Sequence, residues 1–136
     1  MMDRGRRLQR EAGRSPWLVA VLLILLSSAT TRAQGRDPAV GCKTRVVHVR
    51  QILLFDDRNL AKVQTALAAG RPFFDIARQY TDEPGGRAKG GDLGWNCLDS
   101  FYREGALIGS LKPGQHTSEP FEGIYGKHFF ELIESR

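Results

Sequence analysis

The stretch from Tyr80 to Trp95 reads YTDEPGGRAKGGDLGW and has two parts with different backbone preferences. The first part, Thr81 to Lys89, is rich in Thr, Asp, Pro and Gly, and these residue types predict a mobile loop. The second part, Gly90 to Trp95, is a glycine-rich entry to a short strand. A loop followed by a strand therefore stands at the middle of the predicted domain.

Three regular elements are predicted before this stretch. Val46 to Phe55 (VVHVRQILLF) is β-branched and apolar, which favours a strand. Asp56 and Asp57 can accept hydrogen bonds from the first amides of a helix, in which apolar residues recur at helical spacing until Gly70 stops it. A second helix begins at Pro72, where the missing N–H costs nothing.

Further elements are predicted after the central stretch. Ser100 to Leu111 predicts a weaker third helix, because it contains two glycines. A turn at Lys112 to Gln115 leads to two closing strands, Thr117 to Phe121 and His128 to Glu134, joined by a glycine-bearing turn. The order of strands and helices predicts an α+β domain, in which roughly three to four helices pack around a small antiparallel sheet of about four strands.

The charge is unevenly distributed along the 136 residues, which suffice for one domain and a short extra segment. Six of the 20 basic residues stand before residue 34, against only Asp3 and Glu11. The remaining chain is close to neutral, which is a weak electrostatic basis for binding phosphate backbones. We therefore expect no nucleic-acid partner.

Residues 1–33 predict a signal peptide. A basic start, the apolar run Trp17 to Leu26 and a stretch of small residues follow in that order, with a cleavage point before Gln34. The apolar run is shorter than the ~20 residues that cross a bilayer. The alternative is an uncleaved signal-anchor that tethers the domain to a membrane. Residues 34–45 would then form a lead-in to a domain at 46–136, in a protein that is secreted or in the lumen of the endoplasmic reticulum.

Two cysteines, Cys42 and Cys97, follow the predicted cleavage point. In an oxidising compartment they can form one disulfide, which would stabilise the fold by about 3 to 4 kcal/mol. Two free thiols are the alternative. Because Cys and His are not paired at short intervals, we expect no metal site.

Several motifs, in the same order along the chain, resemble those of the parvulin (rotamase, PpiC-like) family of peptidyl-prolyl cis-trans isomerases. Gly90 to Trp95 (GGDLGW) is similar to the family signature, and Val49 to Leu53 (VRQIL) resembles its Val-Arg-His-Ile-Leu strand. Leu111 to Gln115 (LKPGQ) resembles its Leu-x-x-Gly-Glu turn, and Gly126 to Phe130 (GKHFF) its Gly-Tyr-His-Ile-Ile strand. The resemblance covers about residues 46–134 and implies a parvulin-like fold that isomerises X-Pro bonds without a cofactor.

The resemblance also implies an apolar cup for the proline ring. Leu93 falls on the family's pocket leucine and Phe101 on its pocket methionine. The family's pocket phenylalanine has no clean counterpart, although Tyr102 or Leu107 could substitute for it. Phe121 matches the aromatic residue of the family's Val-Phe-Thr strand. The alternative for each of these residues is an ordinary place in the core.

The polar centre implied by the resemblance consists of Glu83, His128 and Gln51. Glu83 stands where the family has Cys or Asp, and His128 matches its second core histidine. Gln51 replaces the first core histidine, but its amide can still hydrogen-bond a neutral histidine and fix its tautomer. His48 lies three residues from Gln51, so strand alternation points it to the opposite face. The alternatives are a solvated acid for Glu83 and a core residue for His128.

The connection after the first predicted strand, Phe55 to Asn59, is short and acidic. Asp56 and Asp57 would repel phosphoserine, so we expect the branch of the family that is not phosphate-directed. The expected partners are proline-containing peptides or unfolded client proteins, bound by a monomer. The alternative function is a proline-peptide binding or chaperone module whose catalysis is weakened by Gln51 and Glu83.

Overall fold

The computed structural model describes residues 41–136. The predicted signal peptide and most of the predicted lead-in lie outside the described residues. Within residues 41–136, no helix is long and apolar enough to cross a membrane.

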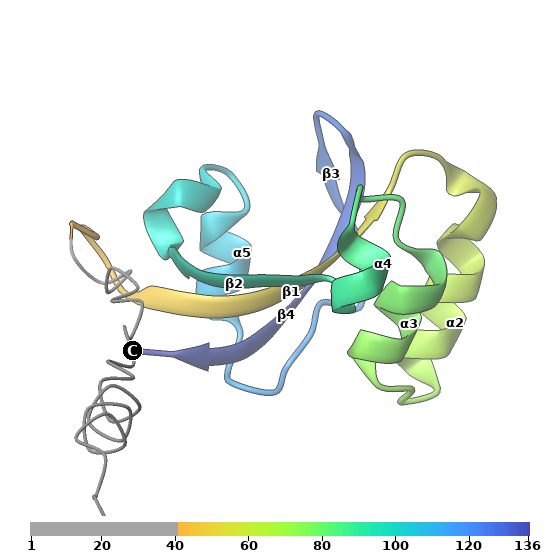
Figure 1. The fold of residues 1–136 in the computed structure, drawn as a ribbon, viewed down its shortest axis with the longest axis horizontal. Helices are drawn as coiled ribbons and strands as arrows, with labels where there is room; N and C mark the ends of the chain where they lie inside the picture. The colour runs from red at the N-terminus through yellow and green to blue at the C-terminus, as the bar shows by residue number, and fades with distance from the viewer. Residues whose placement is uncertain (1–40) are drawn as a thin grey trace, which may run out of the picture. The chain divides into compact units, whose positions relative to one another are not determined.

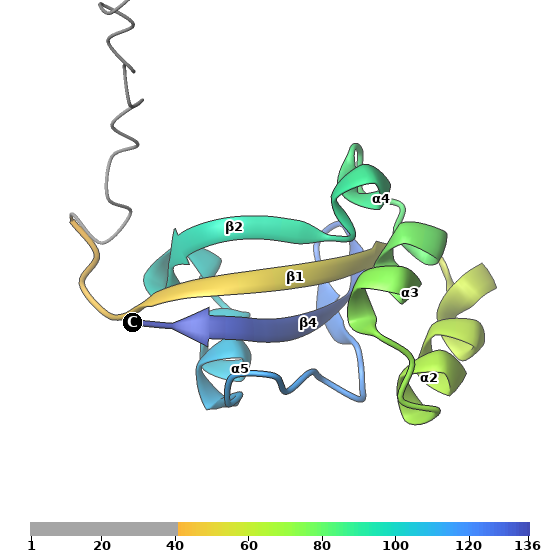
Figure 2. The same ribbon diagram turned by 60° about the horizontal axis from the view of Figure 1, so that its bottom comes forward.

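A four-stranded antiparallel sheet is the centre of the domain. Its strands are β1 (Val46–Leu54), β2 (Asp92–Cys97), β3 (Phe121–Gly123) and β4 (Gly126–Ser135), in the order β2-β1-β4-β3. Figures 1 and 2 show β2, β1 and β4 side by side. The long pairing between β1 and β4 therefore forms the middle of the sheet.

Alternation along β1 divides the core into two clusters, one on each face of the sheet. Val47 and Val49 pack with Ile108, Phe130 and Leu132. The intervening side chains turn to the other face, where Ile52 and Leu54 join the second cluster. A strand whose two faces are both covered explains why Val46 to Phe55 is apolar at nearly every position.

Helices α2 (Leu60–Ala68) and α3 (Phe73–Tyr80) cover the face that carries Ile52 and Leu54. The 3-10 turn η1 (Asp57–Asn59) leads into α2, and the Asp56 side chain accepts a hydrogen bond from the Arg58 amide. Figure 1 shows α2, α3 and the short α4 (Gly86–Lys89) together at one end of the sheet, while α5 lies nearer the other end.

The opposite face is covered by the 3-10 turn η2 (Leu98–Phe101) and α5 (Gly105–Ser110). This arrangement confirms the predicted α+β class. The two predicted helices before the central stretch are also confirmed.

Three local predictions are wrong. The predicted loop Thr81 to Lys89 contains α4, a single helical turn whose flanking Gly85 and Gly90 adopt left-handed conformations. The predicted helix Ser100 to Leu111 is divided into η2 and α5 at Tyr102, where φ is 41°.

The third wrong prediction is the strand Thr117 to Phe121. Only Phe121–Gly123 forms β3, and before it there is an isolated bridge between His116 and Glu131. Pro120 has no N–H with which to extend the ladder, so β3 begins directly after it.

Gly91 allows β2 and its approach loop to lie against β1. Its φ is +76°, and a Cβ atom there would lie 2.2 Å from the carbonyl oxygen of Gln51. The Gln51 amide donates a hydrogen bond of 2.8 Å to the Gly91 carbonyl. Only glycine fits so close a backbone approach at this conformation.

A disulfide joins Cys42 to Cys97, with the two Cα atoms 5.3 Å apart. Its first cysteine precedes β1 and its second ends β2, so it fastens the start of the domain to the edge strand.

Replacing both cysteines with serine should lower the free energy of unfolding by about 3 to 4 kcal/mol, because the cross-link restricts the unfolded chain. Urea unfolding followed by tryptophan fluorescence measures this change. Dithiothreitol should lower the stability of the wild-type chain by a similar amount and leave the double variant unchanged. Equal stability of the oxidised wild type and the double variant would contradict the prediction.

Candidate active site

A cavity of about 470 Å³ lies beside η2 and α5, on the sheet face that carries Val47 and Val49. It is lined from β1, the loop after α3, the segment between η2 and α5, the β3–β4 turn and β4. The lining residues are Gln51, Leu53, Glu83, Ser100, Phe101, Tyr102, Glu104, Ile124, Tyr125, His128 and Phe130.

Thr81 fixes the loop that brings Glu83 to this cavity. Its hydroxyl oxygen accepts a hydrogen bond of 3.0 Å from the Leu53 amide, and the Asp82 amide donates one of 2.7 Å to the Leu53 carbonyl. These bonds replace strand pairing along the end of β1, which β2 no longer accompanies. The buried Thr81 thus ties the start of the loop to β1.

His128 and Gln51 are joined by a hydrogen bond between adjacent strands. The Nδ1 atom of His128 lies 3.1 Å from the Oε1 atom of Gln51. Because an amide oxygen can only accept, Nδ1 carries the hydrogen, and in the neutral ring Nε2 is left with a free lone pair. Burial lowers the pKa of His128, an effect that the charge of Glu104 opposes. The imidazole is therefore predominantly neutral at neutral pH.

Nε2 of His128 is buried and has no hydrogen-bond partner among the described residues. Behind it lies Gly123, where a Cβ atom would stand only 2.6 Å from Nε2. The absence of a side chain at this position therefore makes room for the ring.

Glu83 lies at the other side of Gln51. Burial raises the pKa of its carboxyl, and a hydrogen bond with the Gln51 side chain and the charge of Lys89 oppose this rise. Its Oε2 atom is buried without a partner among the described residues. The three predicted polar residues thus form one connected group, with Gln51 between the other two.

Aromatic rings form the apolar part of the cavity. Phe101 packs edge-on against Phe130, with 6.4 Å between ring centroids, and Phe130 stacks on His128 at 5.9 Å. Two of the predicted pocket residues, Phe101 and Tyr102, are also among those that line the cavity.

Two rim residues were not predicted, Ile124 and Tyr125. They form the turn between β3 and β4 and are 87% and 70% exposed, while Tyr102 is 90% exposed. The signal in the sequence is a pair of large apolar residues inside a glycine-flanked turn, where small polar residues are usual.

Three predicted pocket residues lie outside the cavity: Leu93, Leu107 and Phe121. All three are half-buried against the cluster that contains Ile108, which is consistent with the alternative place in the core. Leu93 and Glu83 both line a smaller hollow of about 180 Å³.

His48 does not approach the cavity. Its Nε2 atom lies 2.7 Å from the Oδ1 atom of Asp92, and its ring lies 5.2 Å from that of Trp95. As the sequence predicted, it does not take the place that Gln51 occupies.

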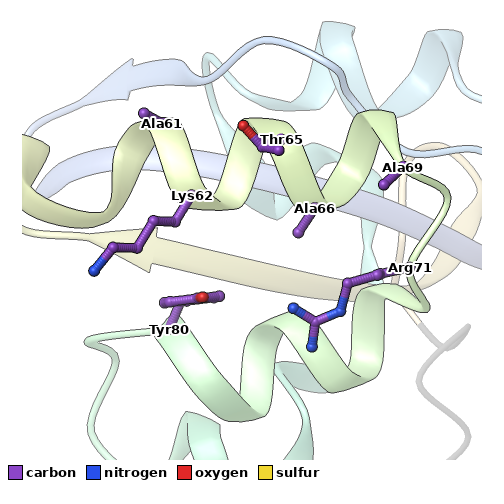
Figure 3. A pocket seen from close by; sticks show the side chains of 7 residues that line it. All are labelled: Ala61, Lys62, Thr65, Ala66, Ala69, Arg71 and Tyr80. Atoms are coloured by element: carbon purple, nitrogen blue, oxygen red, sulfur yellow. The ribbon is translucent and has the colours of Figure 1, made fainter.

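A second hollow, of about 450 Å³, lies between α2 and α3 (Figure 3). Its lining residues are Ala61, Lys62, Thr65, Ala66, Ala69, Arg71 and Tyr80. These described residues include no histidine, no carboxylate and no buried unpaired polar atom. The cavity around His128 is therefore the candidate active site.

No protein-family model matches the chain. The chain is 30% identical to a solved PpiC-type peptidyl-prolyl cis-trans isomerase domain, with a TM-score of 0.60 over 68% of this chain and 93% of that domain. It is 26% identical to the peptidylprolyl isomerase PrsA from Bacillus cereus, with a TM-score of 0.61 over 67% of this chain and 35% of that one.

Among curated proteins, the chain is 39% identical over 79 residues to the chaperone SurA of Shewanella denitrificans. That match covers 57% of this chain but only 18% of the chaperone. The solved PpiC-type domain, by contrast, is matched along nearly its whole length. The chain therefore belongs to the parvulin, or PpiC-type, family of peptidyl-prolyl cis-trans isomerases.

Proposed function

We propose that the chain isomerises X-Pro bonds of client proteins, and that the cavity around His128, Gln51 and Glu83 is its active site. The observation that carries this proposal is the connected polar group, which meets an aromatic cavity in a domain of this family.

The chemistry that the site must supply is limited. Amide resonance opposes rotation about the X-Pro bond, so uncatalysed isomerisation takes tens of seconds or longer. No covalent intermediate is needed. Catalysis requires that the half-turned bond is stabilised more than either planar form.

Apolar walls favour the half-turned bond, because water stabilises the more polar planar amide. Phe101 and Phe130 supply such walls. His128 Nε2 and Glu83 Oε2 lose hydrogen bonds with water on folding and gain none within the described residues. A substrate that bonds to them regains this free energy, and the gain accelerates rotation if the bonds are strongest in the half-turned state.

A second candidate function is peptide binding with little catalysis. Tyr102, Ile124 and Tyr125 expose large apolar surfaces at the rim of the cavity, and such surfaces are typical of protein-interaction sites. SurA proteins, which this chain resembles in part, are named as chaperones. The chain spans 18% to 28% of their length, so their role as a whole comes to this chain only as a proposal.

The clients that we propose are exported proteins, met in the lumen of the endoplasmic reticulum or outside the cell by a monomer. The predicted signal peptide and the Cys42–Cys97 disulfide support an oxidising compartment.

We also propose that the substrates are not phosphorylated. Asp56 and Asp57 pair with Arg58 and Lys127, respectively, and do not line the cavity, so they do not support this proposal. The proposal is supported by the carboxylates of Glu83 and Glu104, which line the cavity and would repel a phosphate group.

Catalysis and binding are separated by one measurement. Exchange NMR on an Ala-Pro peptide should give a faster cis–trans rate when the full chain is present. The variant Glu83→Gln should lower the rate at least about tenfold if its carboxyl acts on the substrate, whereas Glu134→Gln, an exposed glutamate of β4, should not. Peptide shifts without faster exchange would favour the binding module, and neither shifts nor exchange would overturn both functions.

The pKa of the buried His128 imidazole should also lie below its ordinary value of 6.5. The unfolded chain then binds the proton more readily than the folded one. The contribution of His128 to the free energy of unfolding is therefore full above pH 6.5 and is lost as the pH falls towards the lowered pKa. Ring-carbon NMR of His128 measures the midpoint. Glu104→Gln should lower the midpoint further, and a wild-type midpoint at or above 6.5 would contradict the prediction.

A further inference from the structure

We propose that the active-site cavity prefers X-Pro segments with lysine or arginine directly before the proline, and that Glu104 together with Glu83 determines this preference. The inference rests on the proposed function, whose substrate class it narrows.

The charge of the cavity is the first observation. Of the described residues that line it, Glu83 and Glu104 are acidic and none is lysine or arginine. From Gln34 onward, the chain is nearly balanced, with 14 basic and 13 acidic residues. The acidic lining is therefore a local property and does not reflect the overall composition.

Two of the three cations near the cavity, Arg103 and Lys127, are engaged elsewhere. Arg103 lies with its guanidinium 5.6 Å from the centre of the Phe121 ring. Lys127 is held by Asp57 at 2.8 Å and by Glu122 at 3.1 Å. Lys89 does not line this cavity, but it lines a smaller hollow together with Glu83 and lowers the pKa of Glu83 by its charge.

Glu104 has a fixed backbone and an uncommitted side chain. Its amide donates to the Phe101 carbonyl at 2.9 Å, and its carbonyl accepts from the Ile108 amide at 2.9 Å. Its carboxylate forms no ion pair with the residues that the structure describes. The first turn of α5 follows directly, and a negative charge is favourable at that end of a helix.

The unpaired atoms of the polar group point to the same kind of ligand. Oε2 of Glu83 is buried without a partner among the described residues, as is Nε2 of His128, whose residue is only 7% exposed. Both atoms can accept a hydrogen bond, and a cationic side chain has only donors to offer.

The aromatic rim suits the rest of such a side chain. Lysine and arginine carry apolar stems below their charged ends, and these stems pack well on aromatic rings. Tyr102, at 90% exposure, and Tyr125 offer rings at the mouth of the cavity. An acidic or phosphorylated residue at the same place would face two carboxylates, and like charges brought together weaken binding.

The test uses three peptides that differ only in the residue before proline, namely Lys, Gln or Glu. Their dissociation constants and exchange rates are measured by NMR with the full chain. The Lys peptide should bind about tenfold more tightly than the Glu peptide, with Gln between them. Raising the NaCl concentration from 50 to 500 mM should shrink this ratio, because salt screens exposed charges.

Glu104→Gln should reduce the ratio between the Lys and Glu peptides at least threefold, while the matched control Glu134→Gln should leave it unchanged. If that variant does not fold, the salt dependence of the wild type decides. Equal binding of the three peptides, or a ratio independent of salt, would overturn the preference and leave the proposed function standing. If none of the peptides binds or exchanges faster, the proposed function itself fails.

Discussion

The antiparallel pairing of β1 with β4 is the constraint on which the site depends. Leu53 lies opposite His128 and Gln51 opposite Phe130, so Gln51 and His128 are diagonal neighbours on one face. Their side chains can meet only in this register, because a slip by one residue would turn either of them to the face covered by α2 and α3. The same register places Phe130 beside His128, and so the polar and aromatic parts of the cavity are built from two strands.

The remaining walls come from segments that have little regular structure of their own. The loop with Glu83 is held to β1 by Thr81, and the segment with Tyr102 and Glu104 connects two short helical turns. The rigid sheet therefore supplies the hydrogen-bonded centre, while connecting segments supply the charge and the exposed rings. This division is common in binding sites, where loops vary on a fixed scaffold.

Much of the fold could be predicted from the sequence, because long apolar patterns and turn residues specify β1, α2, α3 and β4 locally. Short elements were harder to predict. Helix α4 depends on left-handed glycines on both sides, and the break between η2 and α5 depends on the positive φ of Tyr102, which the sequence pattern does not indicate. The structure brings Gln51, Glu83 and His128 together at one cavity, and their grouping could be predicted because neighbouring motifs fix their strand and loop positions.

The apolar wall was predicted less well. Leu93, Leu107 and Phe121 are as apolar as Phe101, and only three-dimensional packing decides which of these side chains meets the cavity and which meets the core. Ile124 and Tyr125 were missed because a turn was expected to be merely a connection. Likewise, the acidic segment with Asp56 and Asp57 does not line the cavity, because these side chains pair with Arg58 and Lys127, and a short acidic sequence does not reveal such partners.

Gly123 illustrates how a residue without a side chain can govern one that has chemistry. A methyl group there would meet the imidazole from behind and force it to tilt, which would break its alignment with Gln51. The hairpin backbone itself would tolerate alanine, since Gly123 has no left-handed conformation. A single methyl group at position 123 is thus enough to displace the imidazole, although it changes none of the side chains that line the cavity.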